Sequence, residues 1–336
     1  MDNNLKPFIA RLALGETLSA AESETVFGII MSGEATPAQI AGLLMMMRLR
    51  GETVAELVGA VRAMRARMTP VNAPAGAIDV CGTGGDGAGT LNVSTAVTFV
   101  LGGLGVCVAK HGNRALSSRS GAADVLTELG INVDVALDRL PAILDEAGCA
   151  FLFAPRHHAA LRHAAGPRVE LGTRTIFNLL GPMANPAGVT RQLTGVFDPS
   201  WARPIALTLT SLGTTHAWIV HGQGLDELTV SGDNFVVTVN DGQVGERIVT
   251  PEEAGLSRSP LDAIKGGEPA ENASELLALL DGKKSAYRDT VVLNSAAALI
   301  VAGRVTDLRS GAGQASQAIE SGAARATLHR LQQATA

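Results

Sequence analysis

The chain has 336 residues, of which 46% are hydrophobic and 18% are charged, and its formal net charge is −5 at pH 7. A chain of this length buries a full core and favours two lobes over one. Lys and Arg nowhere form a run, and aromatic residues make up only 3% of the chain. The basic and stacking surfaces typical of nucleic-acid binding are therefore missing, and we expect no nucleic-acid partner.

The cysteines and the N-terminus indicate the compartment. Cys81, Cys107 and Cys149 are odd in number and lack metal-ligand spacing, which favours reduced thiols. The N-terminal residues show no signal-peptide pattern, and the longest apolar stretch, 96–109, is too short to span a membrane. We therefore expect a cytoplasmic protein that does not bind a membrane.

The first seventy residues carry helix signals only. Ser19 and Glu22 form a capping box ahead of a helical pattern. Thr36, followed by proline, begins a second helix that Gly51 ends, and Thr53 caps a third. A linker with two prolines follows. These signals predict a small all-helical N-terminal domain.

From residue 77 onward, short apolar runs alternate with helical patterns. This alternation predicts an α/β domain with a mostly parallel central sheet covered by helices. The predicted strands are 77–81, 106–109, 150–153, 192–196 and 217–221, and the predicted helices are 94–104, 122–129, 137–146 and 201–212. A hairpin of 235–239 and 247–250 turns at 240–242, and helices return from Glu271, with Asn272 or Ser274 as the cap.

The segment 157–182 interrupts the alternation with a helical, highly charged pattern. We expect it to leave the sheet and to pack with the N-terminal helices. The predicted small helical domain therefore comprises residues 1–70 and roughly 157–182. The predicted α/β domain comprises residues 71–156 and 183–336.

A glycine-rich segment follows the first predicted strand. It runs from Asp79 to Thr90 and includes Gly82, Gly85 and Asp86. Glycines at the carboxyl end of a strand let backbone N–H groups approach phosphate oxygens closely. The spacing matches neither a Walker loop nor a dinucleotide-binding fingerprint. A flexible loop without a ligand is the alternative interpretation.

The next two segments are rich in polar side chains. Asn92-Val93-Ser94-Thr95 begins a helix, where Ser94 or Thr95 caps the helix, or the hydroxyls and the helix N-terminus bind phosphate. Lys110-His111-Gly112-Asn113-Arg114 follows the second predicted strand directly. Two such loops at the strand ends of one sheet favour an anion site over two surface loops.

Acidic and basic residues later in the chain complete the pattern. Asp226 and Glu227 follow the fifth predicted strand and suit a hard cation such as Mg2+, although the pair taken alone favours a turn with two solvated acids. The segment 157–182 also carries Arg162, His163, Arg168 and Arg174, and an arginine suits a carboxylate ligand. The alternative for any single arginine here is structural pairing, such as an ion pair of Arg174 with Glu170. Together the segments predict group transfer from a phosphorylated donor to a carboxylate-bearing acceptor.

The same segments resemble the anthranilate phosphoribosyltransferase family over almost the whole chain. The matching motifs begin with Gly82-Thr-Gly-Gly-Asp86-Gly, Asn92-Val-Ser-Thr95, Lys110-His-Gly-Asn-Arg114 and Ser117-Ser118, and continue with Arg168-Val-Glu-Leu-Gly172, Arg174-Thr-Ile-Phe-Asn178 and Leu225-Asp226-Glu227. The Lys110–Arg114 run is the most specific of these. The related pyrimidine nucleoside phosphorylases share the architecture and differ in this run.

The resemblance implies a homodimer, an active site between the two domains, and 5-phosphoribosyl 1-diphosphate and anthranilate as substrates. It implies that the donor is bound by Gly82, Gly85, Asp86, Thr90, Asn92, Val93, Ser94, Thr95, Lys110, His111, Gly112, Asn113, Arg114, Ala115, Leu116, Ser117, Ser118 and Ala122. It implies that anthranilate is bound by Gly82, Asn113, Arg168, His111 and His158, and that Mg2+, two ions per subunit, is bound by Ser94, Asp226 and Glu227. No residue matches an acid or base, so we expect catalysis by positioning and electrostatics.

Three departures from the family pattern concern the shape of the site. Ala122 stands where many relatives have Ser, Leu161 stands where they often have Met or Tyr, and Gly166-Pro167 replaces a more usual Val before Arg168.

Two other functions compete with the transferase. The Lys110–Arg114 run argues against a nucleoside phosphorylase, because the related phosphorylases differ there. The negative net charge argues against a noncatalytic relative that binds nucleic acid, because such a protein would have a basic face.

Overall fold

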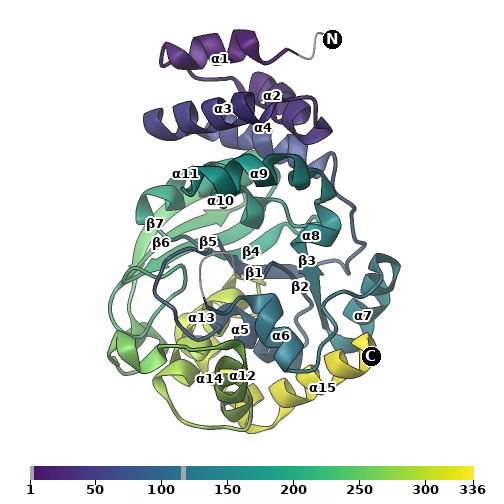
Figure 1. The fold of residues 1–336 in the computed structure, drawn as a ribbon. Coiled ribbons are helices and arrows are strands. Elements are labelled where there is room, and N and C mark those ends of the chain that lie inside the picture. Colours follow the sequence, from purple (N-terminus) through teal and green to yellow (C-terminus); the bar gives the residue numbers. More distant parts are fainter. Residues whose placement is uncertain (1–3, 115–118) are drawn as a thin grey trace.

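The computed structural model describes residues 4–114 and 119–336, and Figure 1 shows two parts. Helices pack at the N-terminal end, and a larger α/β part holds the C-terminus. The first four helices are α1 (Lys6–Ala13), α2 (Ala20–Ser32), α3 (Pro37–Arg50) and α4 (Val54–Arg65). The predicted capping box of Ser19 and Glu22 is confirmed, as are the caps at Thr36 and Thr53. The N-terminal part is therefore helical, as the sequence predicts.

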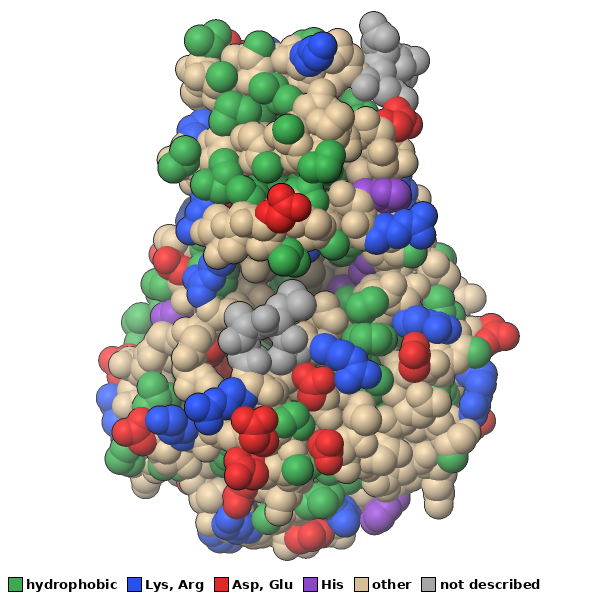
Figure 2. All heavy atoms as spheres, in the orientation of Figure 1, with side chains coloured by type: hydrophobic (Ala, Val, Ile, Leu, Met, Phe, Trp, Pro, Cys, Tyr) green, Lys and Arg blue, Asp and Glu red, His purple; other side chains and the backbone are tan. Residues whose placement is uncertain are grey.

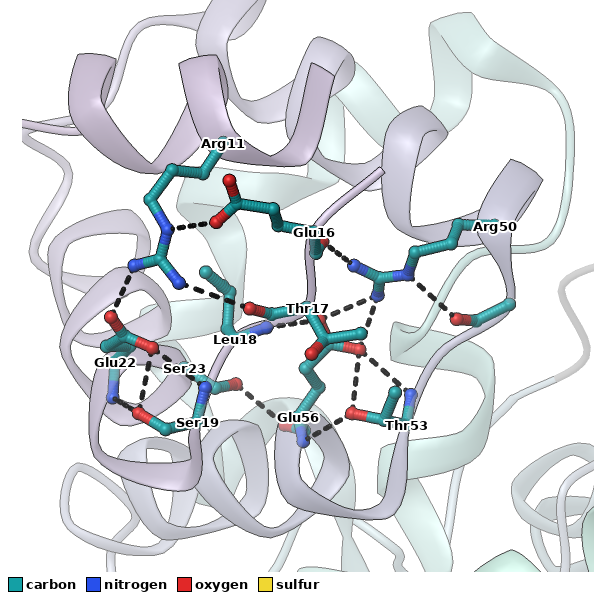
Figure 3. A network of polar contacts seen from close by, with 11 residues as sticks. Arg11, Glu16, Thr17, Leu18, Ser19, Glu22, Ser23, Arg50, Thr53 and Glu56 are labelled. Carbon is teal, nitrogen blue, oxygen red and sulfur yellow. Dashed lines mark hydrogen bonds and ion pairs between the residues drawn. The ribbon is translucent and has the colours of Figure 1, made fainter. Parts of the chain in front are cut away.

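A buried carboxylate ties these helices together, as Figure 3 shows. Glu56 in α4 is fully buried and pairs with Arg50 at the end of α3, with 2.5 Å between Nη2 and Oε2. Its Oε1 accepts a hydrogen bond from the backbone N–H of Leu18 (3.0 Å), and its Oε2 accepts one from the N–H of Thr53 (2.8 Å). The α1–α2 connection is thereby fixed to α3 and α4.

The α/β part contains a seven-stranded sheet in the order β3-β2-β1-β4-β5-β6-β7. The strands are β1 (Ile78–Gly82), β2 (Val108–Gly112), β3 (Cys149–Phe153), β4 (Arg191–Gly195), β5 (His216–Gly222), β6 (Asn234–Asn240) and β7 (Gln243–Val249). Neighbours from β3 to β5 pair in parallel, and β6 and β7 form the antiparallel edge. The predicted mostly parallel sheet is confirmed. The hairpin turns at Asp241 and Gly242, both with positive φ, as a two-residue turn requires.

Helices cover both faces of the sheet and create two cores. Alternate residues of β5 point to opposite faces, so Trp218 and Val220 join one core while Ala217 and Ile219 join the other. The first core contains residues of α5 (Val93–Gly103), α6 (Ala122–Glu128), α7 (Leu140–Ala147), α12 (Pro269–Leu280), α13 (Ala286–Val301), α14 (Leu308–Glu320) and α15 (Ala323–Thr335). The second core contains α11 (Ala202–Ser211) and extends into α2, α3 and α4. The N-terminal helices therefore share a core with the sheet.

The segment that interrupts the strand–helix alternation forms α8 (Ala154–His157), α9 (Arg162–Leu171) and α10 (Phe177–Leu180). Helix α9 packs against α2 and α3, and Figure 1 shows α9 and α10 between the N-terminal helices and the sheet. The domain division at residues 70, 157 and 182 stays a prediction.

Both predicted caps of the C-terminal helix α12, Asn272 and Ser274, are wrong. Helix α12 begins at Pro269 with Glu268 at its N-cap, whereas Asn272 and Ser274 lie inside the helix, and Asn272 is buried. In the described part of the chain, no helix is both long enough and apolar enough to cross a membrane.

Candidate active site

A cavity of about 380 Å³ lies where the ends of the central strands face α4, α9 and α10. Strand β1 pairs with β2 on one side and β4 on the other, so the chain reverses its direction of travel across the sheet at β1. Ligands of open α/β sheets bind at such a reversal, at the carboxyl ends of the strands. The predicted site residues that line the cavity are Gly82, Gly85, Asp86, Thr90, Asn92, Val93, Ser94, Thr95, Lys110, His111, Gly112, Asn113, Arg114, Ala122, Arg168, Asp226 and Glu227.

Five predicted site residues do not appear in this lining. Ala115, Leu116, Ser117 and Ser118 lie outside the described residues. His158 is described, and its ring lies behind the lining residue His111, with 5.1 Å between the ring centroids.

Two glycines allow Asp226 to lie across the ends of β1 and β4. A Cβ atom on Gly82 would stand 2.2 Å from the Oδ2 atom of Asp226. A Cβ atom on Gly195, which is paired with Gly82 in the sheet, would stand 1.5 Å from the carbonyl oxygen of Asp226. Any side chain there would displace the acidic segment. The carboxylate instead accepts a hydrogen bond from the N–H of Gly84 at 2.7 Å, which joins it to the glycine-rich loop.

The acidic side chains of the cavity oppose one another's ionisation. Burial, and then the nearby carboxylate of Asp86, raise the pKa of Asp226 to about 7. Burial, and then the charge of Asp226, raise the pKa of Glu227 to about 8. Carboxylates held this way need a neighbouring cation to stay ionised at neutral pH.

Lys110 is buried, and its charge acts against the rise in the pKa of Glu227. Its Nζ donates hydrogen bonds to the carbonyl oxygen of Val80 (2.6 Å) and to the hydroxyl of Ser94 (3.1 Å). Below it, Asp79 is fully buried and accepts a hydrogen bond from the N–H of His111 at 3.1 Å. Asp79 therefore holds the beginning of the Lys110–Arg114 loop in place. This role of Asp79 could not be predicted from the sequence, because the partners of an acid inside a strand depend on the neighbouring strands.

The N-terminus of α5 is capped differently from the prediction. The structure has Asn92 at the N-cap without a side-chain cap, so capping by Ser94 or Thr95 is wrong. The carboxylate of Glu227 accepts a hydrogen bond from the N–H of Ser94 at 3.1 Å. An anion at a helix N-terminus is stabilised by the free N–H groups there. The acidic pair and the helix N-terminus thus belong to one site.

The two arginines have different surroundings. Arg174 lies beyond the end of α9, donates a hydrogen bond to the carbonyl oxygen of Gly85, and has its guanidinium 3.9 Å from the ring centroid of Phe197. The alternative ion pair with Glu170 is therefore wrong. Arg168 lines the cavity with its guanidinium 5.1 Å from the ring centroid of Phe177, and burial lowers its pKa. Within residues 4–114 and 119–336, no carboxylate forms an ion pair with Arg168.

The histidines beside the cavity are neutral at pH 7. Burial, and then His158, lower the pKa of His111 to about 3, and burial, and then His157, lower the pKa of His158 to about 4. The Nδ1 atom of His111 lies 3.0 Å from the carbonyl oxygen of Gly181. These rings add polar, uncharged atoms to that side of the site.

Sequence reasoning missed the parts of the lining that come from other elements. Gly266, Gly267 and Asn272 reach the cavity from the segment before α12 and from α12 itself. Arg119, Ser120, Met64 and Asn178 also line it. The Gly266-Gly267 pair was a visible signal, since adjacent glycines mark a close approach of backbone.

Comparison with known proteins shows to which family the chain belongs. The helical bundle domain of the glycosyl transferase family matches residues 6–68, and the α/β domain of that family matches residues 75–325. An anthranilate phosphoribosyltransferase from Brucella suis is 56% identical over 328 residues, covering 98% of this chain and 97% of its own. The chain belongs to the anthranilate phosphoribosyltransferase family.

Solved structures of this family superpose over the whole length. The anthranilate phosphoribosyltransferase of Thermus thermophilus is 42% identical with a TM-score of 0.93, and the comparison covers 100% of this chain and 99% of that one. The Saccharomyces cerevisiae enzyme in complex with PRPP and Mg is 26% identical with a TM-score of 0.91, covering 100% and 98%.

The departures from the anthranilate phosphoribosyltransferase pattern come from two different elements around the cavity, α6 and the α9 region. Ala122 and Leu161 line the cavity, and Pro167 lies inside α9 directly before Arg168. Leu161 and Arg168 bracket the first two turns of that helix.

Proposed function

We propose that this chain transfers the phosphoribosyl group of 5-phosphoribosyl 1-diphosphate to the amine of anthranilate in tryptophan biosynthesis, giving N-(5-phosphoribosyl)anthranilate and diphosphate. One observation carries this function. A single cavity is lined on one side by a glycine-rich loop, a lysine and two acids, and on the other by an arginine that forms no ion pair with a carboxylate of the described residues. The first side suits a diphosphate, and the second suits a carboxylate.

The donor occupies the sheet side of the cavity in this proposal. The glycine-rich loop, the N-terminus of α5 and the Lys110–Arg114 loop supply N–H groups and positive charge. Donor contacts come from Gly82, Gly85, Asp86, Thr90, Asn92, Val93, Ser94, Thr95, Lys110, His111, Gly112, Asn113, Arg114 and Ala122. The predicted contacts from Ala115, Leu116, Ser117 and Ser118 lie outside the described residues.

The acidic pair fits Mg2+. The described residues hold no group of three or more His, Cys, Asp or Glu arranged around a metal. Mg2+ is typically held by one or two carboxylates, with water and substrate phosphates as its other ligands. Asp226 and Glu227, with their raised pKa values, and the hydroxyl of Ser94 would hold it, and we propose two ions per subunit. Bound there, Mg2+ supplies positive charge to the diphosphate oxygens.

The acceptor occupies the α9 side. Arg168 binds the anthranilate carboxylate through two parallel hydrogen bonds, and Asn113 and Gly82 lie beside the amine. His111 lines the cavity as a neutral ring, and the neutral ring of His158 lies next to it, outside the lining. An aromatic amine is already neutral at pH 7, so the transfer needs no strong base.

The reaction then proceeds by substitution at the anomeric carbon. The bond from that carbon to the diphosphate oxygen breaks with its electron pair remaining on diphosphate. The amine lone pair forms the new bond from nitrogen to carbon, and the amine afterwards loses a proton to solvent. N–H groups at the glycine-rich loop and at α5 stabilise the charge of the leaving group, and closure of the two domains excludes water.

The helical part supports the proposal of a homodimer. Leu14 and Leu49 in this part are 79% and 81% exposed. Figure 2 shows hydrophobic side chains gathered over the helices at that end of the molecule. Such a patch is typical of a protein–protein interface.

The three cysteines are free thiols, which supports a cytoplasmic location.

The test is direct. The purified protein is mixed with phosphoribosyl diphosphate, MgCl2 and anthranilate, and the loss of anthranilate fluorescence is followed. We expect a decay that requires both substrates and Mg2+. A folded protein that gives no decay contradicts the proposal, and phosphorolysis of thymidine and uridine is then the next assay.

A further inference from the structure

The segment before α12 forms one wall of the cavity and is fixed to the glycine-rich loop. The N–H of Leu91 donates to the carbonyl oxygen of Ile264 at 2.9 Å. The N–H of Gly266 donates to the carbonyl oxygen of Gly89 at 2.8 Å. A change in this wall therefore acts directly on the side of the cavity assigned to the donor.

Asn272 links this wall to the start of α5. Its side chain is 2% exposed. Its Oδ1 accepts a hydrogen bond from the N–H of Gly267 (2.8 Å), and its Nδ2 donates one to the Oδ1 of Asn92 (2.9 Å). A backbone N–H can only donate, so Asn272 must present its oxygen to Gly267 and its NH2 group to Asn92. The orientation of both side-chain amides follows from that one backbone donor.

The NH2 group of Asn92 is consequently left for the cavity. The Oδ1 of Asn92 is occupied by Asn272 and also accepts from the hydroxyl of Ser120 at 3.5 Å. The hydroxyl of Tyr287 donates to the carbonyl oxygen of Asn92 at 3.0 Å, which fixes its backbone. Asn92 lines the cavity, and no residue in the described ranges accepts a hydrogen bond from its Nδ2.

We propose that Asn272 is a positioning residue that fixes the amide of Asn92 with its NH2 group toward the anionic oxygens of the donor. The chain of hydrogen bonds runs from Gly267 through Asn272 to Asn92 and ends on a phosphate or diphosphate oxygen. The site then presents the NH2 group of Asn92, a hydrogen-bond donor, to the ligand. The oxygen of a reversed amide would repel the anionic ligand at the same place. This role rests on the proposed donor site.

Asn272→Asp tests the role because it changes the polarity of the chain with almost no change in shape. A carboxylate still accepts from Gly267, but it presents a second oxygen to Asn92. The amide of Asn92 then reverses to donate to that carboxylate, and its oxygen faces the donor. We expect the KM for phosphoribosyl diphosphate to rise about tenfold or more, with the anthranilate KM and kcat changed less than about twofold.

Two further variants separate this effect from charge and from folding. Asn132→Asp makes the same charge change at an exposed position and leaves the donor KM unchanged. Asn272→Ser removes the hydrogen bond from Asn272 to Asn92 without adding charge. If Asn272→Asp does not fold, the donor KM of Asn272→Ser tests the proposal instead. Thermal unfolding and calorimetric titration with phosphoribosyl diphosphate and Mg2+ accompany each variant.

A double-mutant cycle with Asn92→Ala decides the question. If Asn272 acts through Asn92, Asn92→Ala raises the donor KM and Asn272→Asp adds nothing further in that background. An equal further rise in the Asn92→Ala background shows that Asn272 acts by charge or packing, and it overturns the inference alone. An unchanged donor KM in Asn92→Ala instead removes Asn92 from the donor site, and both the proposed site and the inference fail.

Discussion

Arg168→Ala should weaken anthranilate binding and leave donor binding almost intact. The guanidinium of Arg168 lines the cavity, and no described carboxylate pairs with it, so its hydrogen-bonding capacity is available to a ligand. Hydrogen bonds to a charged group contribute about 1.5–3 kcal/mol, which corresponds to roughly a tenfold to 150-fold rise in the anthranilate KM. We expect the KM for phosphoribosyl diphosphate to change less than about threefold. Steady-state rates from anthranilate fluorescence, with each substrate varied in turn, give both constants.

The same helix supplies the controls. Arg162→Ala removes an exposed arginine at the first position of α9 and should change neither KM. Arg168→Lys keeps the charge and loses the planar fork, so its anthranilate KM should lie between those of the wild type and Arg168→Ala. Equal increases in both KM values for Arg168→Ala would refute the assignment, because a general distortion of the cavity affects both substrates alike.

Three other predictions concern stability, metal binding and pH. Glu56→Ala leaves its arginine partner without a counter-charge and should lower the free energy of unfolding by about 3 kcal/mol; a loss below about 1 kcal/mol in urea unfolding would contradict the central role of Glu56 in the helical network. Asp226→Ala should shift the Mg2+ dependence of the rate to higher concentration, and an unchanged titration would reject the metal role. Burial lowers the pKa of His111 to about 3 and of His158 to about 4, so the unfolded chain binds protons that the folded chain does not. The free energy of unfolding should therefore fall as the pH drops from 6.5 toward these values, and His158→Gln should reduce that slope.

The elements that follow from local signals could be predicted from the sequence. Capping residues such as Ser19 and Thr53 act within one helical turn, so the first helices are where the sequence indicates. The same holds for the hairpin turn at Asp241 and Gly242, where positive φ angles match the residue types. The parallel sheet follows from the alternation of strands and helices, which leaves few other ways to bury both faces.

The predictions that failed concern partners distant in sequence. The N–H of Ser94 at the N-terminus of α5 donates a hydrogen bond to the carboxylate of Glu227, which is 133 residues away in the sequence. The residues next to Ser94 in the sequence therefore do not predict this contact. Asn272 was expected to cap a helix because asparagine favours that position, but burial against Asn92 outweighs the local preference. Arg174 lies past the end of its helix, where a spacing of four residues no longer brings it beside Glu170.

The position of Asp226 is determined by backbone packing more than by side-chain contacts. Gly82 and Gly195 end adjacent strands, and each would clash with the acidic segment if it carried a Cβ atom. The carboxylate of Asp226 then meets the N–H of Gly84, so the acidic segment and the loop assigned to phosphate are held together by one contact. A glycine-to-alanine change at position 82 or 195 consequently moves an acid and a phosphate loop at once. Glycine is therefore required at positions 82 and 195 because the segment that contains Asp226 crosses over the ends of these strands. Without side chains there, the proposed metal ligand Asp226 can lie against the glycine-rich loop of the proposed donor site.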